Sequence, residues 1–514
     1  MNNAAIAMSP EAAASLRQPR GLKIIFLTEM WERFSYYGNQ ALLVLYLVNK
    51  LGFKDADALS MYGTYMLLLN ITPLFGGWIA DKFLGLRLAA VIGAAVMMLG
   101  HFAMAVPSLM YFALGMLIIG NGFFKPSTIS MVGELYDGPE DGRRDGGYTM
   151  YYLGINVGAI LATIICGTLG ETVGWHYGFA SAGIGLAIGL VTFIGWQRLL
   201  GRAGLRDGQR PIGLHDLPII TVYVATSIAV VACALWAWPF AARATSGTSP
   251  WILAAAAAAL VAGLVAGLVA AWRRSETRSA NYAPLTRAEW RRVAALSVVV
   301  GCVAIFFVCT AQAGGSMSLF ADKQTRRLIA GHEFPATWFQ MINPILVLVL
   351  APLFTLLWTR INSSRFGLPD TSKIAFGMIV MGLGFVVMTV AQGRADALGP
   401  VGPQWLGGAY TLQTIGEVML TPIALALLSR VAPERVLGLA MGLFMLTVGV
   451  ANKVAGNLED MLEGSGVQPY FILMAMAIVL GVMLLLLTPL FTRMFEVRDA
   501  AEPASPQSPE SALA

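Results

Sequence analysis

The stretch Glu29-Met-Trp-Glu32-Arg33-Phe34-Ser35-Tyr36-Tyr37-Gly38 carries three ionisable side chains and two tyrosines within an apolar segment that runs from residue 22 to about residue 47. On a helix its polar side chains share one face, which holds Glu29, Glu32, Arg33, Tyr36, Tyr37 and Gln40. A charge near the centre of a membrane helix is costly, so such residues usually face a cavity or a partner. This polar stripe therefore predicts a functional site.

The composition of the chain is that of a membrane protein. Its residues are 57% hydrophobic and only 12% charged, which excludes an ordinary soluble globular domain and implies a polytopic protein in a lipid bilayer. The formal charge of +5 does not indicate a nucleic-acid partner, because membrane proteins collect basic residues in cytoplasmic loops. The four cysteines lie in apolar segments without C-x-x-C spacing, so neither a disulfide nor a metal site is predicted.

Segments long enough to cross about 30 Å of hydrocarbon occur about fourteen times, at 22–49, 59–80, 87–105, 108–134, 146–169, 177–200, 216–239, 251–272, 292–320, 336–359, 372–392, 405–431, 437–458 and 469–493. The basic residues gather at one alternate set of segment ends, and the positive-inside rule makes that set cytoplasmic. Since the number of segments is even, both termini are expected on the cytoplasmic side. Lys323, Arg326 and Arg327 run against this pattern.

Two charged linkers, at 202–216 and 273–288, flank the pair of segments at 216–239 and 251–272. Removing that pair leaves six segments on each side. The expected organisation is therefore a cytoplasmic N-terminal tail (1–21), an N-terminal six-helix bundle (22–200), a linker with two additional transmembrane helices (201–288), a C-terminal six-helix bundle (289–495) and a disordered cytoplasmic tail (496–514).

The loop after the second segment reads Gly76-Gly-Trp-Ile-Ala80-Asp81-Lys82-Phe-Leu-Gly85-Leu-Arg87, which resembles the cytoplasmic signature of the major facilitator superfamily. The glycines allow close helix approach, and Asp81 is expected to pair with Lys82, Arg87 or the N-terminus of a neighbouring helix. The resemblance implies an all-α polytopic fold in which two six-helix bundles surround a central cavity and work by alternating access.

Lys125 and Glu417 are the clearest further charges inside apolar segments. Each is followed by a proline, Pro126 or Pro422, which removes a backbone donor and bends the helix. Unpaired buried charges are expensive, so these groups are expected to meet the charges of the first segment across the cavity. Two structural alternatives remain open at this point. Lys125 could extend its ammonium toward the membrane surface, and Glu417 could form a fixed ion pair with Lys453 or Arg33.

Five motifs in order resemble the proton-coupled oligopeptide transporter family of the prokaryotic type. They are Glu29-x-x-Glu32-Arg33-Phe34-x-Tyr36-Tyr37-Gly38, Gly122-x-Phe124-Lys125-Pro126, Tyr151-Tyr152-x-x-Ile155-Asn156-x-Gly158, Trp338-Phe339-Gln340-x-x-Asn343-Pro344, and Gly416-Glu417 with Pro422. The resemblance extends from about residue 22 to residue 493. It implies proton-driven uptake of di- and tripeptides across the cytoplasmic membrane of a bacterium, by a monomer without a cofactor.

The resemblance also implies roles for single residues. Arg33 and Lys125 would hold the carboxylate of the peptide, and Glu417 would receive its ammonium. Glu29, Glu32 and Glu417 would couple transport to protons, with Lys125 as partner of the first two. The remaining substrate-binding set is Tyr36, Tyr37, Tyr65, Tyr152, Asn156, Gln312 and Asn343, and the gating or structural set is Asp81, Arg87, Pro126 and Pro422.

The chain departs from the family at residue 311, where an alanine precedes Gln312 in place of the usual acidic residue. This departure puts more of the proton coupling on the three remaining carboxylates. Rival functions are transport of nitrate or another small anion through Arg33 and Lys125, and a peptide receptor that does not transport. An enzyme is not expected, because the chain contains neither an H-E-x-x-H motif nor a G-x-S-x-G motif.

Overall fold

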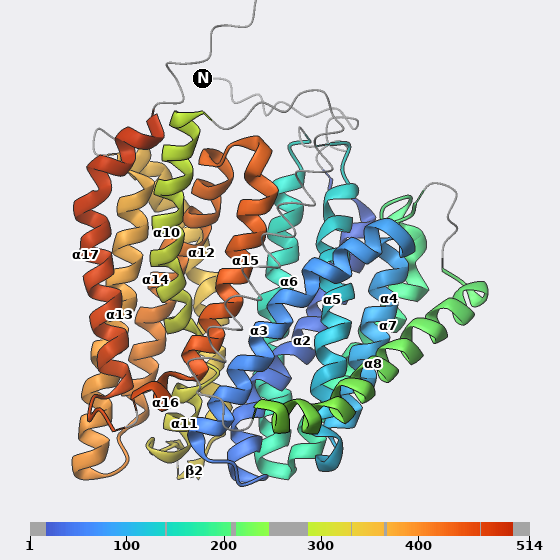
Figure 1. Ribbon diagram of the computed structural model, residues 1–514, viewed down its shortest axis with the longest axis horizontal. Helices are drawn as coiled ribbons and strands as arrows, with labels where there is room; N and C mark the ends of the chain where they lie inside the picture. Colours follow the sequence, from blue (N-terminus) through green and yellow to red (C-terminus); the bar gives the residue numbers. More distant parts are fainter. Residues whose placement is uncertain are drawn as a thin grey trace, which may run out of the picture.

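A computed structural model describes residues 17–138, 141–206, 212–245, 286–329, 331–363, 367–462 and 464–496. Long helices that run side by side make up almost all of it (Figure 1). Within the described residues, eleven helical segments are long and apolar enough to cross a membrane. The prediction of a polytopic all-α membrane protein is confirmed.

The N-terminal half forms one bundle of six helices. They are α2 (Arg20–Asn49), α3 (Asp55–Ile79), α4 (Leu86–Met104), α5 (Met110–Glu134), α6 (Arg144–Ala162) and α7 (Trp175–Trp196). α2 packs between α6 and α7, and α4 packs against α5. The polar stripe of α2 is thereby enclosed by helices of its own bundle.

The C-terminal half forms a second bundle of six long helices. They are α10 (Arg287–Ala311), α12 (Ile342–Asn362), α13 (Asp370–Leu398), α14 (Pro403–Val431), α15 (Glu434–Gly456) and α17 (Pro469–Glu496). α13 packs against both α14 and α17. Between the bundles in sequence, α8 (Leu217–Thr245) packs on α4 and α5. The second predicted linker helix, 251–272, lies outside the described residues.

Three predicted segments are less regular than the sequence suggested. The segment 292–320 is broken after α10 by a turn at Gly314 and Gly315, and resumes as α11 (Ser316–Lys323). A side chain at Gly314 would meet the Tyr62 hydroxyl at 2.2 Å, so the turn exists where another helix comes very close. The segment 336–359 starts as the 3₁₀ helix η7 (Ala336–Met341) before α12. α6 continues through the π-helical turns η3 (Thr163–Gly167) and η4 (Leu169–Val173).

A short antiparallel hairpin of β1 (Leu328–Ile329) and β2 (His332–Glu333) was not predicted. It lies at one end of the molecule together with α11 and α16 (Leu458–Leu462), and we call this end the hairpin end (Figure 1, bottom). The two bundles meet here. η3 packs against η7, and α3 packs along α15, where a side chain at Gly63 would lie 2.7 Å from the Asn452 carbonyl oxygen.

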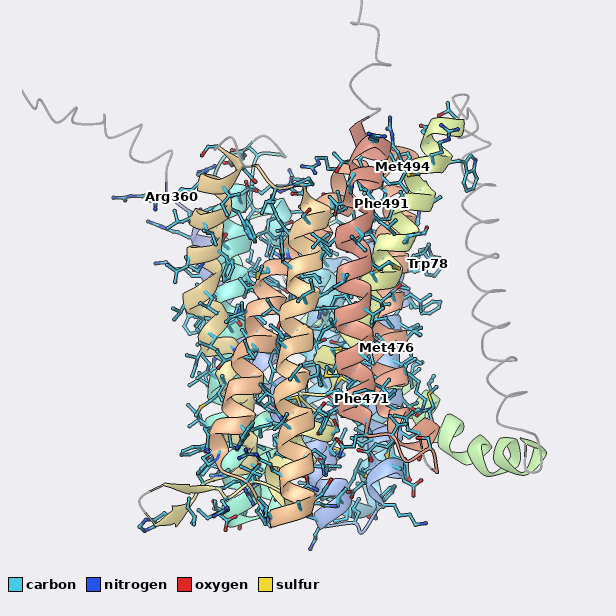
Figure 2. All side chains as sticks on the ribbon, turned by 90° about the vertical axis from the view of Figure 1, so that its left-hand side faces the viewer. Trp78, Arg360, Phe471, Met476, Phe491 and Met494 are labelled. Atoms are coloured by element: carbon cyan, nitrogen blue, oxygen red, sulfur yellow. The ribbon has the colours of Figure 1, made fainter. Side chains whose placement is uncertain are left out.

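The outer wall of the molecule is apolar. Trp78 on α3 and Phe471 and Met476 on α17 point outward and are exposed (Figure 2). Arg360, by contrast, lies at the end opposite the hairpin (Figure 2). An exposed wall of large apolar side chains between polar ends is the pattern expected of a surface that contacts lipid.

Candidate functional site

The charged stripe of α2 is buried as a compact cluster. Arg33 Nε lies 2.5 Å from Glu32 Oε2 and 3.2 Å from Glu29 Oε1. All three side chains are buried inside the N-terminal bundle. Two carboxylates therefore share one guanidinium through a single nitrogen. Arg33 Nη2 is buried without a hydrogen-bond partner among the described residues.

Two hydroxyl groups from neighbouring helices complete the surroundings of Glu29. Thr128 Oγ1 on α5 lies 3.2 Å from Glu29 Oε2, and Tyr151 Oη on α6 lies 3.3 Å from that hydroxyl. Both side chains are buried. Sequence analysis gave neither residue a role, although Tyr151 stands within a quoted motif and Thr128 follows Lys125 by one helical turn.

Lys125 lies near the same charges but does not pair with them directly. Its ammonium interacts electrostatically with Arg33, Glu32 and Glu29, and the side chain is accessible to solvent. No ion pair within 4.0 Å joins it to another described residue. The expected direct pairing of Glu29 and Glu32 with Lys125 is thus replaced by pairing with Arg33. Because Lys125 stays beside this cluster, the alternative in which its ammonium extends to the membrane surface is not favoured. Pro126 follows it inside α5.

Three of the predicted tyrosines line the space beside Arg33. The guanidinium lies 4.5 Å from the centre of the Tyr36 ring, which packs edge-on against Tyr37. Tyr65 is buried and its hydroxyl accepts a hydrogen bond of 3.1 Å from Asn39. The contact of a cation with an aromatic face stabilises Arg33 in this position.

Glu417, the carboxylate that the sequence predicts as a site residue of the C-terminal bundle, lies on α14. Its Oε2 accepts a hydrogen bond of 2.7 Å from Asn343 Nδ2, which also lies 3.2 Å from the Thr414 hydroxyl. Lys453 instead donates to the backbone and side-chain oxygens of Ser60. The alternative of a fixed pair between Glu417 and Lys453 or Arg33 is wrong, since neither cation lies within 4.0 Å of it. Pro422 lies inside α14, beyond Glu417.

Tyr152 and Asn156 are neighbours on α6. Tyr152 is 48% exposed and interacts electrostatically with Glu417 of the other bundle, so it faces the space between the bundles. The Asn156 amide donates to the Tyr152 carbonyl oxygen at 2.9 Å.

Gln312 is engaged by protein groups on both sides of its amide. Its nitrogen lies 3.4 Å from the carbonyl oxygens of Val308 and Ala455, and its oxygen accepts a hydrogen bond of 2.7 Å from Ser316. In this arrangement Gln312 ties α10 to α15 and spans the break before α11.

The ion pair expected between Asp81 and Lys82 or Arg87 is not found among the described residues. Asp81 is exposed and forms no ion pair within 4.0 Å in the described part of the chain. Arg87 is buried, and its guanidinium donates to the carbonyl oxygens of Ala203 and Gly201, both at 2.7 Å. Glu134 accepts from the backbone of Gly204 at 2.7 Å. Arg87 therefore anchors the loop after α7, a contact distant in sequence that the local motif could not indicate.

Outside the membrane-spanning segments, two carboxylates have shifted pKa values. Hydrogen bonds from Arg143 hold the pKa of Asp141 well below its usual range. Burial raises the pKa of Glu459, and the nearby Asp55 and Asp460 add to this effect while Lys323 opposes it. Among the described residues, no three His, Cys, Asp or Glu side chains gather closely enough to hold a metal ion.

Over most of its length, the sequence is similar to known proteins. A family model described as PTR2, the POT family, matches residues 87–479. The chain belongs to the POT family. This family is a family of transporters, and its fold is the one described above.

Individual relatives of this POT family member cover nearly the whole chain. The uncharacterized transporter YclF of Bacillus subtilis strain 168 is 31% identical over 510 residues, which are 96% of this chain and 98% of the relative. Dipeptide and tripeptide permease A of Erwinia pyrifoliae is 28% identical over 88% of each chain. A crystal structure of peptide transporter POT in complex with sulfate has a TM-score of 0.76 and 30% identity, and covers 94% of this chain and 99% of that one.

Proposed function

We propose that this chain takes up di- and tripeptides together with protons by alternating access. The observation that carries the proposal is the opposition of Arg33 and Lys125 in one bundle to Glu417 in the other. A short peptide carries a carboxylate at one end and an ammonium at the other. Arg33 and Lys125 can bind the carboxylate and Glu417 the ammonium, so binding does not depend on the peptide side chains. A relative named dipeptide and tripeptide permease A supports this substrate class.

Arg33 is the expected ligand of the peptide carboxylate. Its Nε pairs with Glu29 and Glu32, and Nη2 has no hydrogen-bond partner among the described residues. Guanidinium groups bind carboxylates through two parallel hydrogen bonds, which need a terminal nitrogen such as this one. Lys125 adds a second positive charge that no carboxylate within 4.0 Å neutralises in the described part of the chain.

Glu29 and Glu32, the two carboxylates that pair with Arg33, are the groups that bind the transported proton. When Glu29 or Glu32 takes up a proton, it loses its attraction to the guanidinium, which is then free for the peptide. Peptide and proton therefore favour the same state of the cluster, which is the thermodynamic condition for coupling. With alanine at 311, no acidic residue precedes Gln312 to share this task.

On the C-terminal side, Asn343 is a partner of Glu417. Its amide nitrogen is committed to Glu417 and Thr414, so it orients the carboxylate for the peptide ammonium. The Asn343 carbonyl oxygen and Asn156 are then the amide groups that meet the peptide backbone. Tyr36, Tyr37 and Tyr152 supply adaptable walls with apolar area and a hydroxyl.

The proposed location is the cytoplasmic membrane of a bacterium, with both termini inside the cell and the hairpin end outside. Lys323, Arg326 and Arg327 at the hairpin end run against the positive-inside rule, and two of them are held in ion pairs across the bundle boundary. Lys323 pairs with Asp55 at 2.6 Å, and Arg327 pairs with Glu171 at 3.2 Å. We further propose a monomer that carries out no catalysis.

The test of coupling is the variant Glu32→Gln in proteoliposomes. We expect it to retain exchange of labelled dialanine for unlabelled dialanine, because peptide binding persists. It should lose accumulation driven by an inward proton gradient, because one coupling carboxylate is gone. Glu333→Gln, which removes an exposed carboxylate at the hairpin end, is the matched control. Equal loss of exchange and accumulation in Glu32→Gln would assign Glu32 a structural role instead.

A further inference from the structure

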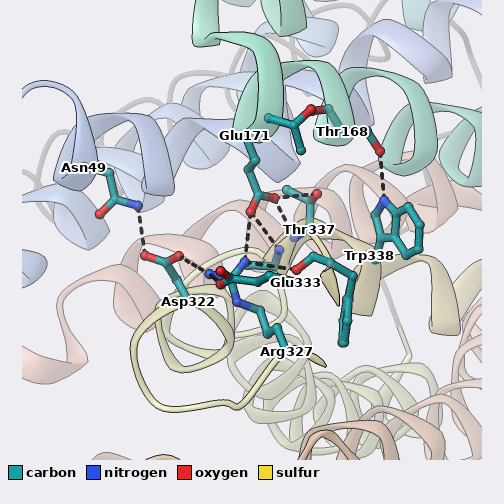
Figure 3. A network of polar contacts seen from close by, with 11 residues as sticks. Asn49, Thr168, Glu171, Asp322, Arg327, Glu333, Thr337 and Trp338 are labelled. Atoms are coloured by element: carbon teal, nitrogen blue, oxygen red, sulfur yellow. Dashed lines mark hydrogen bonds and ion pairs between the residues drawn. The ribbon is translucent and has the colours of Figure 1, made fainter. Parts of the chain in front are cut away.

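Glu171, at the hairpin end of the N-terminal bundle, contacts several groups of the C-terminal bundle. The Glu171 carboxylate accepts hydrogen bonds from the backbone nitrogens of Ala336 and Thr337, at 2.7 and 2.9 Å, and from the Thr337 hydroxyl at 2.7 Å (Figure 3). It also lies 3.2 Å from Arg327 Nη1. One carboxylate thus holds four donors of the opposite bundle.

Three of these donors, the Ala336 and Thr337 amides and the Thr337 hydroxyl, belong to the start of η7, which has no cap of its own. Pro335 precedes the helix and offers no side-chain hydrogen bond to the first free amides. The first N–H groups of a helix need acceptors, and a carboxylate satisfies them best because it also complements the positive end of the helix. The cap of a C-terminal-bundle helix is therefore supplied by the N-terminal bundle.

Further contacts around Glu171 cross the same boundary. Asn49 donates to Asp322 at 2.8 Å, and the Trp338 indole donates to Thr168 at 2.9 Å (Figure 3). At Gly167, an added side chain would lie 2.2 Å from the Thr337 hydroxyl, so the Thr337 side chain packs directly against the Gly167 backbone. Polar contacts and close packing coincide at this boundary.

Arg327 organises the C-terminal side of the contact. It pairs with Asp322 at 3.1 Å and with Glu333 at 2.9 Å, both within its own bundle, in addition to Glu171. The side chains of Arg327 and Glu171 are each only 11% exposed. Ion pairs that are this well shielded and supported by other hydrogen bonds cost more to break than surface pairs.

The charged contacts between the bundles lie at one end of the molecule. The ion pairs that join the bundles within the described residues, Glu171 with Arg327 and Asp55 with Lys323, both lie at the hairpin end. Opening of this end must separate η4 from η7, and every contact of Glu171 to the C-terminal bundle would then break together.

We infer that Glu171 is a latch that holds the hairpin end shut and sets the balance between the two states of the transporter. The inference rests on the alternating access of the proposed function. Contacts present in one state and absent in the other are what bias a two-state equilibrium. Glu333 binds the same arginine but moves with it, so Glu333 does not contribute to the bias.

The distance between the bundles at the hairpin end tests the latch directly. Spin labels are placed in the full chain at Tyr177→Cys on α7 and Leu398→Cys on α13, which are exposed positions on different bundles. The four native cysteines are replaced by alanine. Double electron–electron resonance in lipid nanodiscs then measures the populations of short and long distances.

We expect Glu171→Ala to raise the ratio of long to short distances by about tenfold or more, the effect of losing hydrogen bonds to a charged group. Glu171→Gln keeps an acceptor for the amides but loses the charge, so it should give a smaller rise. If the alanine variant does not fold, the result for Glu171→Gln alone tests whether Glu171 holds the hairpin end shut. Glu333→Gln should match the parent. An unchanged ratio in both Glu171 variants, or an equal rise in Glu333→Gln, would overturn the inference. Because distances are read without transport, failure of the parent to accumulate peptide would contradict the proposed function separately.

Discussion

Arg33 and Glu417 belong to separate bundles, and each is held by partners of its own bundle. Arg33 is fixed by Glu29, Glu32 and the Tyr36 ring, and Glu417 by Asn343. Under the proposed function, these two opposite charges bind a molecule that carries both charges. This is the physical basis for preferring a zwitterionic peptide over a simple anion.

Glu459 gives a pH dependence that can be measured without transport. It is half-buried on α16 and faces Asp55 of α3, Lys323 of α11 and Tyr470 of α17, with Asp460 beside it. Burial and the neighbouring carboxylates raise its pKa in the folded protein above the unfolded value of about 4.3. The folded state therefore holds the proton more tightly, and stability falls as the pH rises through the folded pKa.

Glu459→Gln mimics the protonated form and should raise the melting temperature above that folded pKa, for example at pH 8. The gain should vanish below about pH 4, where the parent glutamate is protonated in folded and unfolded chains alike. Asp396→Asn, at an exposed carboxylate held by Gln392 on its own helix, serves as control. A gain independent of pH would contradict the account.

The residues of the site that share one helix could be predicted from the sequence, because helical spacing alone places Glu29, Glu32 and Arg33 on one face. Contacts between helices could not. Thr128 and Tyr151 reach Glu29 from α5 and α6, and Arg87 turns away from Asp81 to the loop after α7. Each depends on packing between segments far apart in the chain, which leaves no periodic signal.

At the scale of elements, the close contact of α3 with α15 is the second device that shuts the hairpin end. A side chain at Gly63 would lie 2.7 Å from the Asn452 carbonyl oxygen and 3.1 Å from Gly456 Cα. Both contacts are to backbone, so the helices can accommodate it only by moving apart.

Gly63→Ala should therefore open the hairpin end, with a rise in the long-distance population between labels at Tyr177 and Leu398. Alanine also stabilises a helix by up to about 1 kcal/mol over glycine, in open and shut states alike, so helix propensity does not produce the shift. Gly442→Ala on α15, where nothing lies within 4 Å, is the matched control. If Gly63→Ala keeps the distances of the parent, α3 and α15 do not limit closure.

The long helices were predictable because a run of apolar residues long enough to span the bilayer has few alternatives. The interruptions were not. Gly314 and Gly315 break a segment that hydropathy reads as continuous, and η7 starts as a 3₁₀ helix that is capped from the other bundle. The hairpin of β1 and β2 is only two residues on each strand, too short for an alternating pattern.

At the scale of the whole molecule, the two bundles touch at the hairpin end, while Lys125 and Tyr152 remain accessible to solvent from within. Under the proposed orientation, the hairpin end, where the bundles touch, is the end that faces outside the cell. The basic residues that run against the positive-inside pattern, Lys323, Arg326 and Arg327, all have partners at the hairpin end. Lys323 and Arg327 pair across the boundary, and Arg326 donates to the Pro400 carbonyl oxygen.

The most direct test of the central claim is accumulation of labelled dialanine by proteoliposomes under an inward proton gradient. The parent chain should concentrate dialanine above the external level, di- and tripeptides should compete, and nitrate should not. Glu417→Gln should abolish accumulation, because the peptide ammonium loses its only nearby carboxylate in the C-terminal bundle within the described residues. Uptake by the parent that is inhibited by nitrate but not by peptides, or full accumulation by Glu417→Gln, would contradict the account.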